Sequence, residues 1–134
     1  MSVDLVPSTG RWTFPAGQTS LTQFTFVTLN GSGQLVVPAA GAQCVVLDDA
    51  PALAPGGAPG PYVVGVSYGV VFEGVIRVKL GAGGITALAP VTTDNAGLAV
   101  AAGSGNVING VAMAAGNAGD LCSIKVSLAG AIHA

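Results

Sequence analysis

The sequence predicts an all-β protein, a small β-sandwich or barrel with an extended N-terminal arm. Short runs of valine, isoleucine, threonine and aromatic residues recur along the chain, divided by glycine, proline and asparagine, which is typical of strands and turns. No window combines apolar residues at helical spacing with helix caps. A chain of 134 residues fits one domain and is long enough to bury a core without disulfides or metals.

Residues 1–20 are predicted to form either an extended N-terminal arm or edge strand that contacts a neighbouring subunit, or a strand of the core. The segment contains two prolines and exposes large apolar side chains along an extended stretch, including the only tryptophan of the chain. Aromatic side chains are enriched as anchors at interfaces. We therefore expect neighbouring subunits to be contacted by Leu5, Val6, Trp12 and Phe14.

Residues 21–134 are predicted to form the β domain. Strands are expected at 21–29, 34–37, 43–47, 62–67, 72–80, 98–101, 107–114 and 120–128. In 72–80 the charged residues Glu73, Arg77 and Lys79 share one face, opposite an apolar face, as a half-buried strand requires. In 21–29, Phe26 and Val27 fall on opposite faces, so both sides of that strand are expected to be covered.

Turn residues separate these strands. Asparagine, aspartate and glycine cluster at 30–33, 81–84, 94–97 and 117–120, which predicts tight turns. Residues 50–61 are rich in proline and glycine without periodicity and are predicted to form a long surface loop or a stiff connector.

The composition argues against an enzyme. Only 7% of the residues are charged while 51% are hydrophobic. The single histidine, His133, lies at the carboxyl end, where chains commonly fray. Asp48 and Asp49 are adjacent, and no further carboxylates follow nearby, so a solvated turn is expected there. We predict no catalytic, cofactor-binding or metal-binding residues and no cofactor.

The two cysteines leave two alternatives. Cys44 and Cys122 either form a disulfide or are small buried residues with free thiols, and the second interpretation is favoured because free cysteine is often buried. In 120–128, Cys122 falls on the apolar face, which supports burial.

Charge and hydropathy also bear on partners. The chain has four lysines and arginines, scattered along it, which does not make the basic stripe that nucleic-acid binding requires. Uncharged stretches at 50–72 and 95–119 are broken by proline or glycine, so no membrane helix is expected. Residues 1–10 lack the features of a secretory signal, which predicts a soluble protein made in the cytoplasm.

Glycine-rich turns follow one another in a distinctive order between residues 31 and 128. The successive pieces are GQLVVPAAGA (33–42), VVLDDAP (45–51), EGV (73–75), LGAGGITA (80–87), PVTTDNAG (90–97), NGVAMAA (109–115) and AGD (118–120). This order resembles the small capsid decoration, or cement, proteins of tailed bacteriophages. The resemblance covers roughly the last three-quarters of the chain. One departure is Leu88-Ala89 before Pro90, where the family tends to have Gly-Asp.

The resemblance implies a virion structural protein on the capsid exterior. Such a protein binds the assembled shell of the major capsid protein, stabilises contacts between neighbouring subunits, and often forms homo-oligomers, with a trimer favoured here. Leu5, Val6, Trp12 and Phe14 would then contact the capsid or a neighbouring subunit. The alternative is a surface- or carbohydrate-binding β domain of a phage tail or fibre component.

Overall fold

The structure is a computed structural model that describes residues 10–58, 60–128 and 131–134. Within this part of the chain there is no helix, and hence none that could span a membrane. The strands are β1 (Gly10–Pro15), β2 (Phe26–Leu29), β3 (Leu35–Val36), β4 (Val45–Leu47), β5 (Ser67–Lys79), β6 (Pro90–Thr93), β7 (Ala99–Ala101), β8 (Gly110–Ala112) and β9 (Leu121–Ser127). The predicted all-β class is confirmed.

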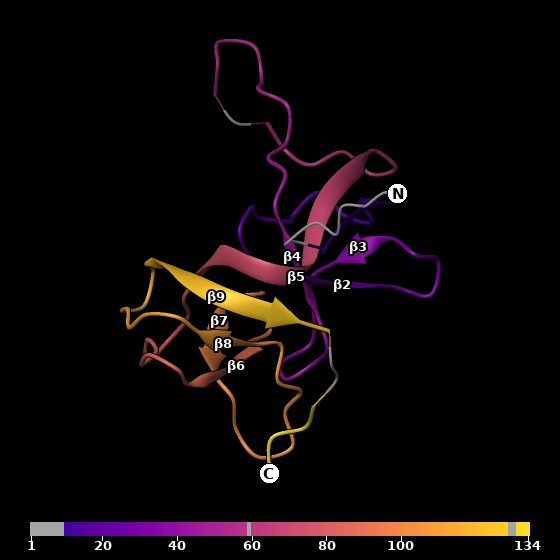
Figure 1. Cartoon of the computed structure of the whole chain (residues 1–134). Coiled ribbons are helices and arrows are strands. Elements are labelled where there is room, and N and C mark those ends of the chain that lie inside the picture. The colour runs from indigo at the N-terminus through magenta and orange to yellow at the C-terminus, as the bar shows by residue number, and fades with distance from the viewer. Residues whose placement is uncertain (1–9, 59, 129–130) are drawn as a thin grey trace, which may run out of the picture.

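The strands form one curled antiparallel sheet in the order β3-β2-β4-β5-β9-β8-β6-β7, and β1 pairs with β5. Figure 1 shows β5 running through the middle of the molecule, with β2–β4 towards one end and β6–β9 towards the other. The first half of β5 pairs with β1 and β4, and its second half pairs with β9. β5 therefore joins the two halves of the fold.

Two hydrophobic cores lie on opposite faces of β5 and its neighbours. The large core includes Phe26, Val71 and Val78, and the small core includes Val27 and Val70. Phe26 and Val27 are each 1% exposed, so the prediction that both faces of this strand are covered is confirmed. The alternation predicted for the strand beginning at Phe72 is also confirmed, with buried Val78 between exposed Arg77 and Lys79.

Four of the predicted strands differ substantially from the observed ones. β5 begins at Ser67, five residues before the predicted start at Phe72, and so takes in the last residue of the strand predicted at 62–67. β2 begins only at Phe26 because Phe24 has a φ of 61°, which interrupts extended backbone. Residues 62–66 form no strand, because Gly65 has a φ of 88° and the Val66 N–H bonds back to the Val63 carbonyl at 3.1 Å. β8 spans only three of the eight residues predicted at 107–114.

β6 was not among the predicted strands. It is four residues long and starts at Pro90, which has no N–H to donate, so its sequence carries a weak strand signal.

The predicted turn at 30–33 is confirmed and joins β2 to β3. The Asn30 side-chain oxygen accepts hydrogen bonds from the backbone N–H of Ser32 (2.9 Å) and of Gln34 (3.0 Å). The turn at 94–97 is built in the same way, because Asp94 Oδ1 accepts from Ala96 and Leu98 at 2.9 Å each. These side chains replace the backbone partners that a tight turn leaves unpaired.

Both cysteines are buried and free, so the interpretation as small core residues is confirmed. Cys44 and Cys122 belong to the large core. Nearby, the buried Asn109 joins two segments, since its Oδ1 accepts from the Cys44 N–H at 2.9 Å and its Nδ2 donates to the Ala42 carbonyl at 2.8 Å.

Candidate interaction surface

The described residues that could act in catalysis or bind a metal ion do not form a cluster. Among the described residues, no three His, Cys, Asp or Glu side chains gather closely enough to hold a metal ion. His133 is not frayed as expected, because its backbone N–H donates to the Asn106 carbonyl at 2.8 Å and its carbonyl accepts from Gly105 at 2.8 Å. The carboxyl end is thereby tied to the segment that precedes β8.

Two of the four predicted contact residues lie together on β1. Trp12 and Phe14 fall on one face of this strand, and Trp12 is 64% exposed. Phe14 packs partly against the small core. Leu5 and Val6 lie outside the described residues, so their expected role stays a prediction.

Trp12 and Phe14 form one wall of an apolar groove with a volume of about 320 Å³. Strands β1, β2, β4 and β5 and the residue after β9 supply its lining: Trp12, Phe14, Leu29, Val45, Phe72 and Leu128. Every lining side chain is apolar, and three of them are aromatic. We call this surface the aromatic groove.

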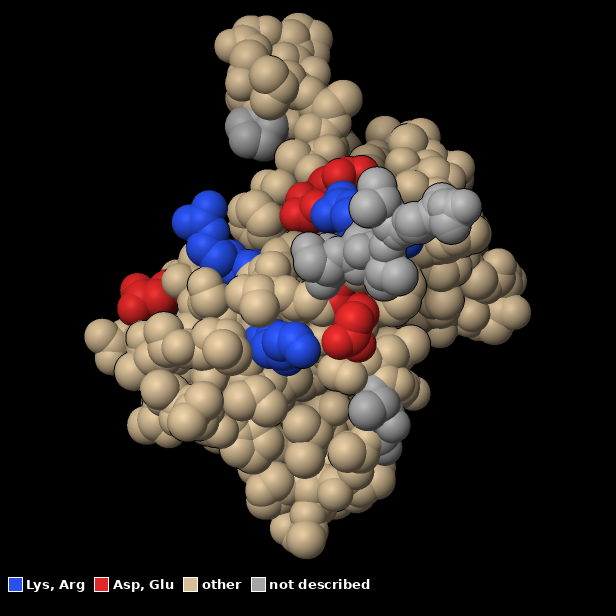
Figure 2. Space-filling view, viewed as in Figure 1, with Lys and Arg blue, Asp and Glu red and all other residues tan. Residues whose placement is uncertain are grey.

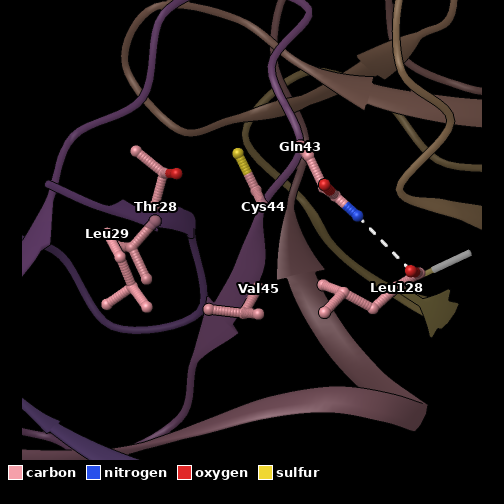
Figure 3. Close-up of a pocket in the computed structure, with 7 residues that line it drawn as sticks. Thr28, Leu29, Gln43, Cys44, Val45 and Leu128 are labelled. Carbon is pink, nitrogen blue, oxygen red and sulfur yellow. Dashed lines mark hydrogen bonds between the residues drawn. The ribbon is translucent and has the colours of Figure 1, made fainter. Parts of the chain in front are cut away.

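A smaller hollow of about 170 Å³ continues the aromatic groove, because both are lined by Leu29, Val45 and Leu128. Figure 3 shows this hollow, with Gln43 Nε2 donating a hydrogen bond to the Leu128 carbonyl at 3.3 Å. Cys44 also lines it, but burial raises the pKa of its thiol from 9.0 to about 12. The thiol therefore stays neutral near pH 7 and is no nucleophile there.

An ion-pair network fixes β1 beside β4 and β5. Arg11 pairs with Asp48, and its Nη2 lies 3.7 Å from Asp49 Oδ1. Asp49 Oδ2 accepts from the Gly69 N–H at 2.7 Å. The expectation of a solvated turn at Asp48 and Asp49 holds only in part, because Asp49 is exposed to solvent but both carboxylates also bind neighbouring strands. Arg11 and Trp12 are adjacent in β1, so their side chains lie on opposite faces of the strand. The ion-pair network therefore holds β1 in place without lining the aromatic groove.

The two tyrosines are structural. Tyr62 and Tyr68 are 3% and 6% exposed and pack edge to face with ring centroids 4.7 Å apart. The Tyr62 hydroxyl donates to the Asp49 carbonyl at 2.7 Å. Burial, followed by the charges of Tyr68 and Asp49, raises the pKa of Tyr62 to about 12. Neither ring is available as a platform for a ligand.

Four groove residues escaped the sequence reasoning: Leu29, Val45, Phe72 and Leu128. Leu29 and Leu128 end predicted strands and carry no signal that separates a surface residue from a core residue. Their meeting depends on β2, β4, β5 and β9 lying together, which alternation along single strands does not reveal. Only the aromatic content of β1 was visible in the sequence.

Comparisons with known proteins identify a structural relative. No family model and no curated protein matches the sequence. The structure is similar to the crystal structure of the N base of the head fibre protein gp8.5 of bacteriophage phi29, with a TM-score of 0.60 and 16% identity over 93% of this chain and 99% of that one. The two chains share a fold. The resemblance to capsid decoration proteins stays a prediction, because at this identity the similarity to the head fibre base shows the fold alone.

Proposed function

We propose that this chain is a phage virion structural protein. It would bind the outside of an assembled capsid and stabilise contacts between neighbouring subunits of the major capsid protein. This proposal rests on the aromatic groove, because it is a preformed apolar surface that is lined by no charged side chain. Exposed apolar surface of this kind is typical of protein–protein contact sites.

The shared fold with a head fibre base supports a role in the virion. That relative belongs to a fibre on a phage head, a location consistent with the capsid exterior. The order of glycine-rich turns points independently to capsid decoration proteins.

Stabilisation would arise by mass action. A protein that binds the assembled shell but not its dissociated subunits favours assembly, and many copies act on one particle. The driving force would be burial of the apolar side chains of the aromatic groove. A homo-oligomer, with a trimer favoured, would add avidity because several copies engage the shell together.

No enzymatic activity, cofactor, nucleic-acid partner or membrane partner belongs to this proposal. Figure 2 supports the exclusion of nucleic acid, because blue and red side chains are interspersed over the middle of the face shown. Lys125 Nζ, for example, lies 3.8 Å from Glu73 Oε2. A mixed distribution offers no basic track for a phosphate backbone.

The deciding experiment adds the purified protein to capsid shells that lack it. We expect the protein to co-sediment with the shells and to appear as added density on their outer face by electron microscopy. Trp12→Ala should lower the affinity by about 2 kcal/mol, roughly 30-fold, because it removes the most exposed aromatic side chain of the groove.

Leu88→Ala is the matched control, since Leu88 is 73% exposed and does not line the groove. If the Trp12→Ala and Leu88→Ala variants bind the shells equally well, the aromatic groove is not part of the contact with the shell. No binding of the parent protein to any shell would reject the proposal.

A second candidate is the base domain of a head fibre, or another surface- or carbohydrate-binding fibre component. The shared fold favours this candidate. Carbohydrate binding has weaker support, because the indole N–H of Trp12 is the one side-chain donor among the lining residues of the groove, and none of them has a side-chain acceptor. Reproducible hits on a glycan array, lost in Trp12→Ala, would favour it over shell stabilisation.

A further inference from the structure

The outward face of the β5–β9 pair gathers most of the positive charge of the chain. Arg77 and Lys79 lie on β5 and Lys125 lies on β9, and all three are exposed. The opposite face of the same two strands packs in the large core. Arg11, the one other lysine or arginine of the sequence, is already paired with two aspartates. The cations left for another molecule therefore share one surface.

The register of the two strands brings these cations close together. Arg77 lies opposite Ser123, and Lys125 lies opposite Val75, so Arg77 and Lys125 are diagonal neighbours. Diagonal neighbours on one face of a sheet are separated by about 7–8 Å. Lys79 follows two residues after Arg77 and so points to the same side of the strand. We call this surface the basic face: Val75, Arg77, Lys79, Leu121 and Lys125.

The chain itself neutralises only part of this charge. Lys125 Nζ lies 3.8 Å from Glu73 Oε2, but both side chains are about half exposed, so the ion pair is weak. Among the residues that the structure describes, no carboxylate lies within ion-pair distance of Arg77 or Lys79. Asp120, which precedes β9, accepts a hydrogen bond at 3.0 Å from a backbone N–H of its own turn. Because neighbouring like charges repel each other, facing carboxylates of a partner would stabilise the basic face.

The basic face is opposite in sign to the chain as a whole, whose formal net charge is −2. It holds three of the four lysines and arginines, while Glu73 is the only carboxylate in β5 or β9. In Figure 2, blue side chains lie over β5 and β9 with uncharged surface between them. A positive patch on an acidic protein orients the molecule towards a partner of the opposite sign.

Apolar side chains between the cations indicate that the partner is a protein. Val75 and Leu121 are 53% and 44% exposed. Leu121 lies opposite Lys79, and Val75 lies opposite Lys125, so each apolar side chain adjoins a cation. A contact with a protein surface buries the apolar groups as well as pairing the charges. A phosphate backbone would pair the charges but leave the apolar groups without a partner.

We infer that the basic face docks on a protein surface that carries aspartate and glutamate carboxylates. Arg77 can bind a carboxylate through two parallel N–H groups, and the Lys79 ammonium can bind another. No residue of the basic face lines the aromatic groove, so this contact is separate from the proposed contact through the groove. The identification of this partner with the capsid shell rests on the proposed function. On the shell, the charges would orient the chain while the groove supplies apolar burial.

Charge removal at two exposed positions tests the contact on shells that lack this protein. The chain carrying Arg77→Gln and Lys79→Gln should bind the shells about tenfold more weakly, because it loses two charge pairs with the partner. Its binding should also depend less steeply on salt concentration than that of the parent chain, since fewer charges remain to be screened. Co-sedimentation at several salt concentrations measures both quantities.

The matched control carries Thr19→Glu and Ser104→Glu. It changes the net charge by the same amount, but both positions are exposed and lie outside the basic face and the aromatic groove. We expect this control to bind nearly as well as the parent chain. Parent-like melting of both double variants by circular dichroism shows that the fold is intact. Equal losses of affinity in the two double variants, or binding of the parent chain that is independent of salt, would overturn the inference.

Crosslinking identifies the groups of the partner. Lys79 and Lys125 are the only lysines of the chain, so apart from the amino terminus all its amines lie on the basic face. A carbodiimide, which joins amines to adjacent carboxylates, should link Lys79 to aspartate or glutamate residues of the shell. Mass spectrometry locates the linked residues. Links to the shell that involve only carboxylates of this chain would show the reverse polarity and overturn the inference.

A soluble carboxylate probe separates this inference from the proposed function. Poly-L-glutamate should shift the backbone NMR signals of residues 75–79 and 121–125, and the glutamine double variant should lose these shifts. The shifts without any binding to shells would support the basic face and reject the proposed function. Shell binding that is weakened by Trp12→Ala but not by the glutamine double variant would support the proposed function and overturn the inference. Absence of both shell binding and shifts would overturn both.

Phosphate is the competing ligand. We expect double-stranded DNA and phosphatidylglycerol vesicles to bind more weakly than poly-L-glutamate at equal charge concentration, because three cations beside Glu73 make no continuous track for phosphates. Tighter binding of either would assign the basic face to phosphate groups and overturn the inference.

Discussion

Leu88 has a strained backbone conformation that few contacts of its side chain stabilise. Its φ is 66°, a left-handed conformation that is unfavourable for a residue with a Cβ atom. The decoration proteins that the sequence resembles tend to have glycine at this place. The side chain is 73% exposed, so little packing offsets the strain.

We therefore predict that Leu88→Gly is more stable than Leu88→Ala by about 1 kcal/mol, because only glycine relieves the strain. This order is the reverse of that expected at an ordinary position, where glycine is the less stable of the two. Thermal denaturation followed by circular dichroism measures the difference. Alanine matching or exceeding glycine at this position would show that the backbone here is unstrained.

Strand β5 contains a glycine at the point where its pairing partner changes from β1 to β9. Glu73 pairs with Gly10 of β1 and with Ser127 of β9, and the next residue, Gly74, has a φ of 122°. A side chain rarely adopts this conformation, and Gly74 lies inside the strand that joins both halves of the sheet. The glycine lets the strand continue past this junction.

Gly74→Ala should destabilise the protein by about 1–3 kcal/mol, the typical cost of holding a non-glycine residue in such a conformation. Gly31→Ala is the matched control, because a Cβ there would meet nothing within 4 Å. Both changes restrict the unfolded chain equally, so their difference reports strain. Urea denaturation measures it, and equal free energies of unfolding would contradict this role of Gly74.

Because only 7% of the residues are charged, few groups can make the stability of the protein depend on pH. Burial raises the pKa of Cys44 from 9.0 and, with the Tyr68 and Asp49 charges, that of Tyr62 from 10.0, each to about 12. A raised pKa means that the folded chain binds the proton more tightly than the unfolded chain does. The contribution of these two protons to the free energy of unfolding is therefore fully present below pH 9 and is lost as the pH rises towards 12.

We predict a progressive fall in the free energy of unfolding between pH 9 and 12. A chain with Cys44→Ala and Tyr62→Phe should lose stability less steeply over this range, although its stability at pH 7 is lower. Chemical denaturation at a series of pH values measures both slopes. Parallel curves for the two chains would contradict the assignment to these groups.

Local sequence patterns were enough to predict the all-β class, the alternation of β5 and β9, the turn at Asn30 and the burial of both cysteines. These features depend on residues close in sequence, through side-chain alternation along a strand and the hydrogen bonding of asparagine and aspartate in turns. Trp12 and Phe14 were predicted as contact residues in the same way, because they are aromatic and lie on an extended segment.

The groove that Trp12 and Phe14 share with Leu29, Val45, Phe72 and Leu128 could not be predicted from local patterns and is a product of the packing of the strands. These residues are far apart in the chain and meet because β1, β2 and β4 lie beside the first half of β5, and β9, which precedes Leu128, pairs with its second half. The link from Arg11 to Asp48 and Asp49 is of the same kind. Strand order and pairing partners depend on the free energy of the whole sheet, which no local pattern of residues specifies.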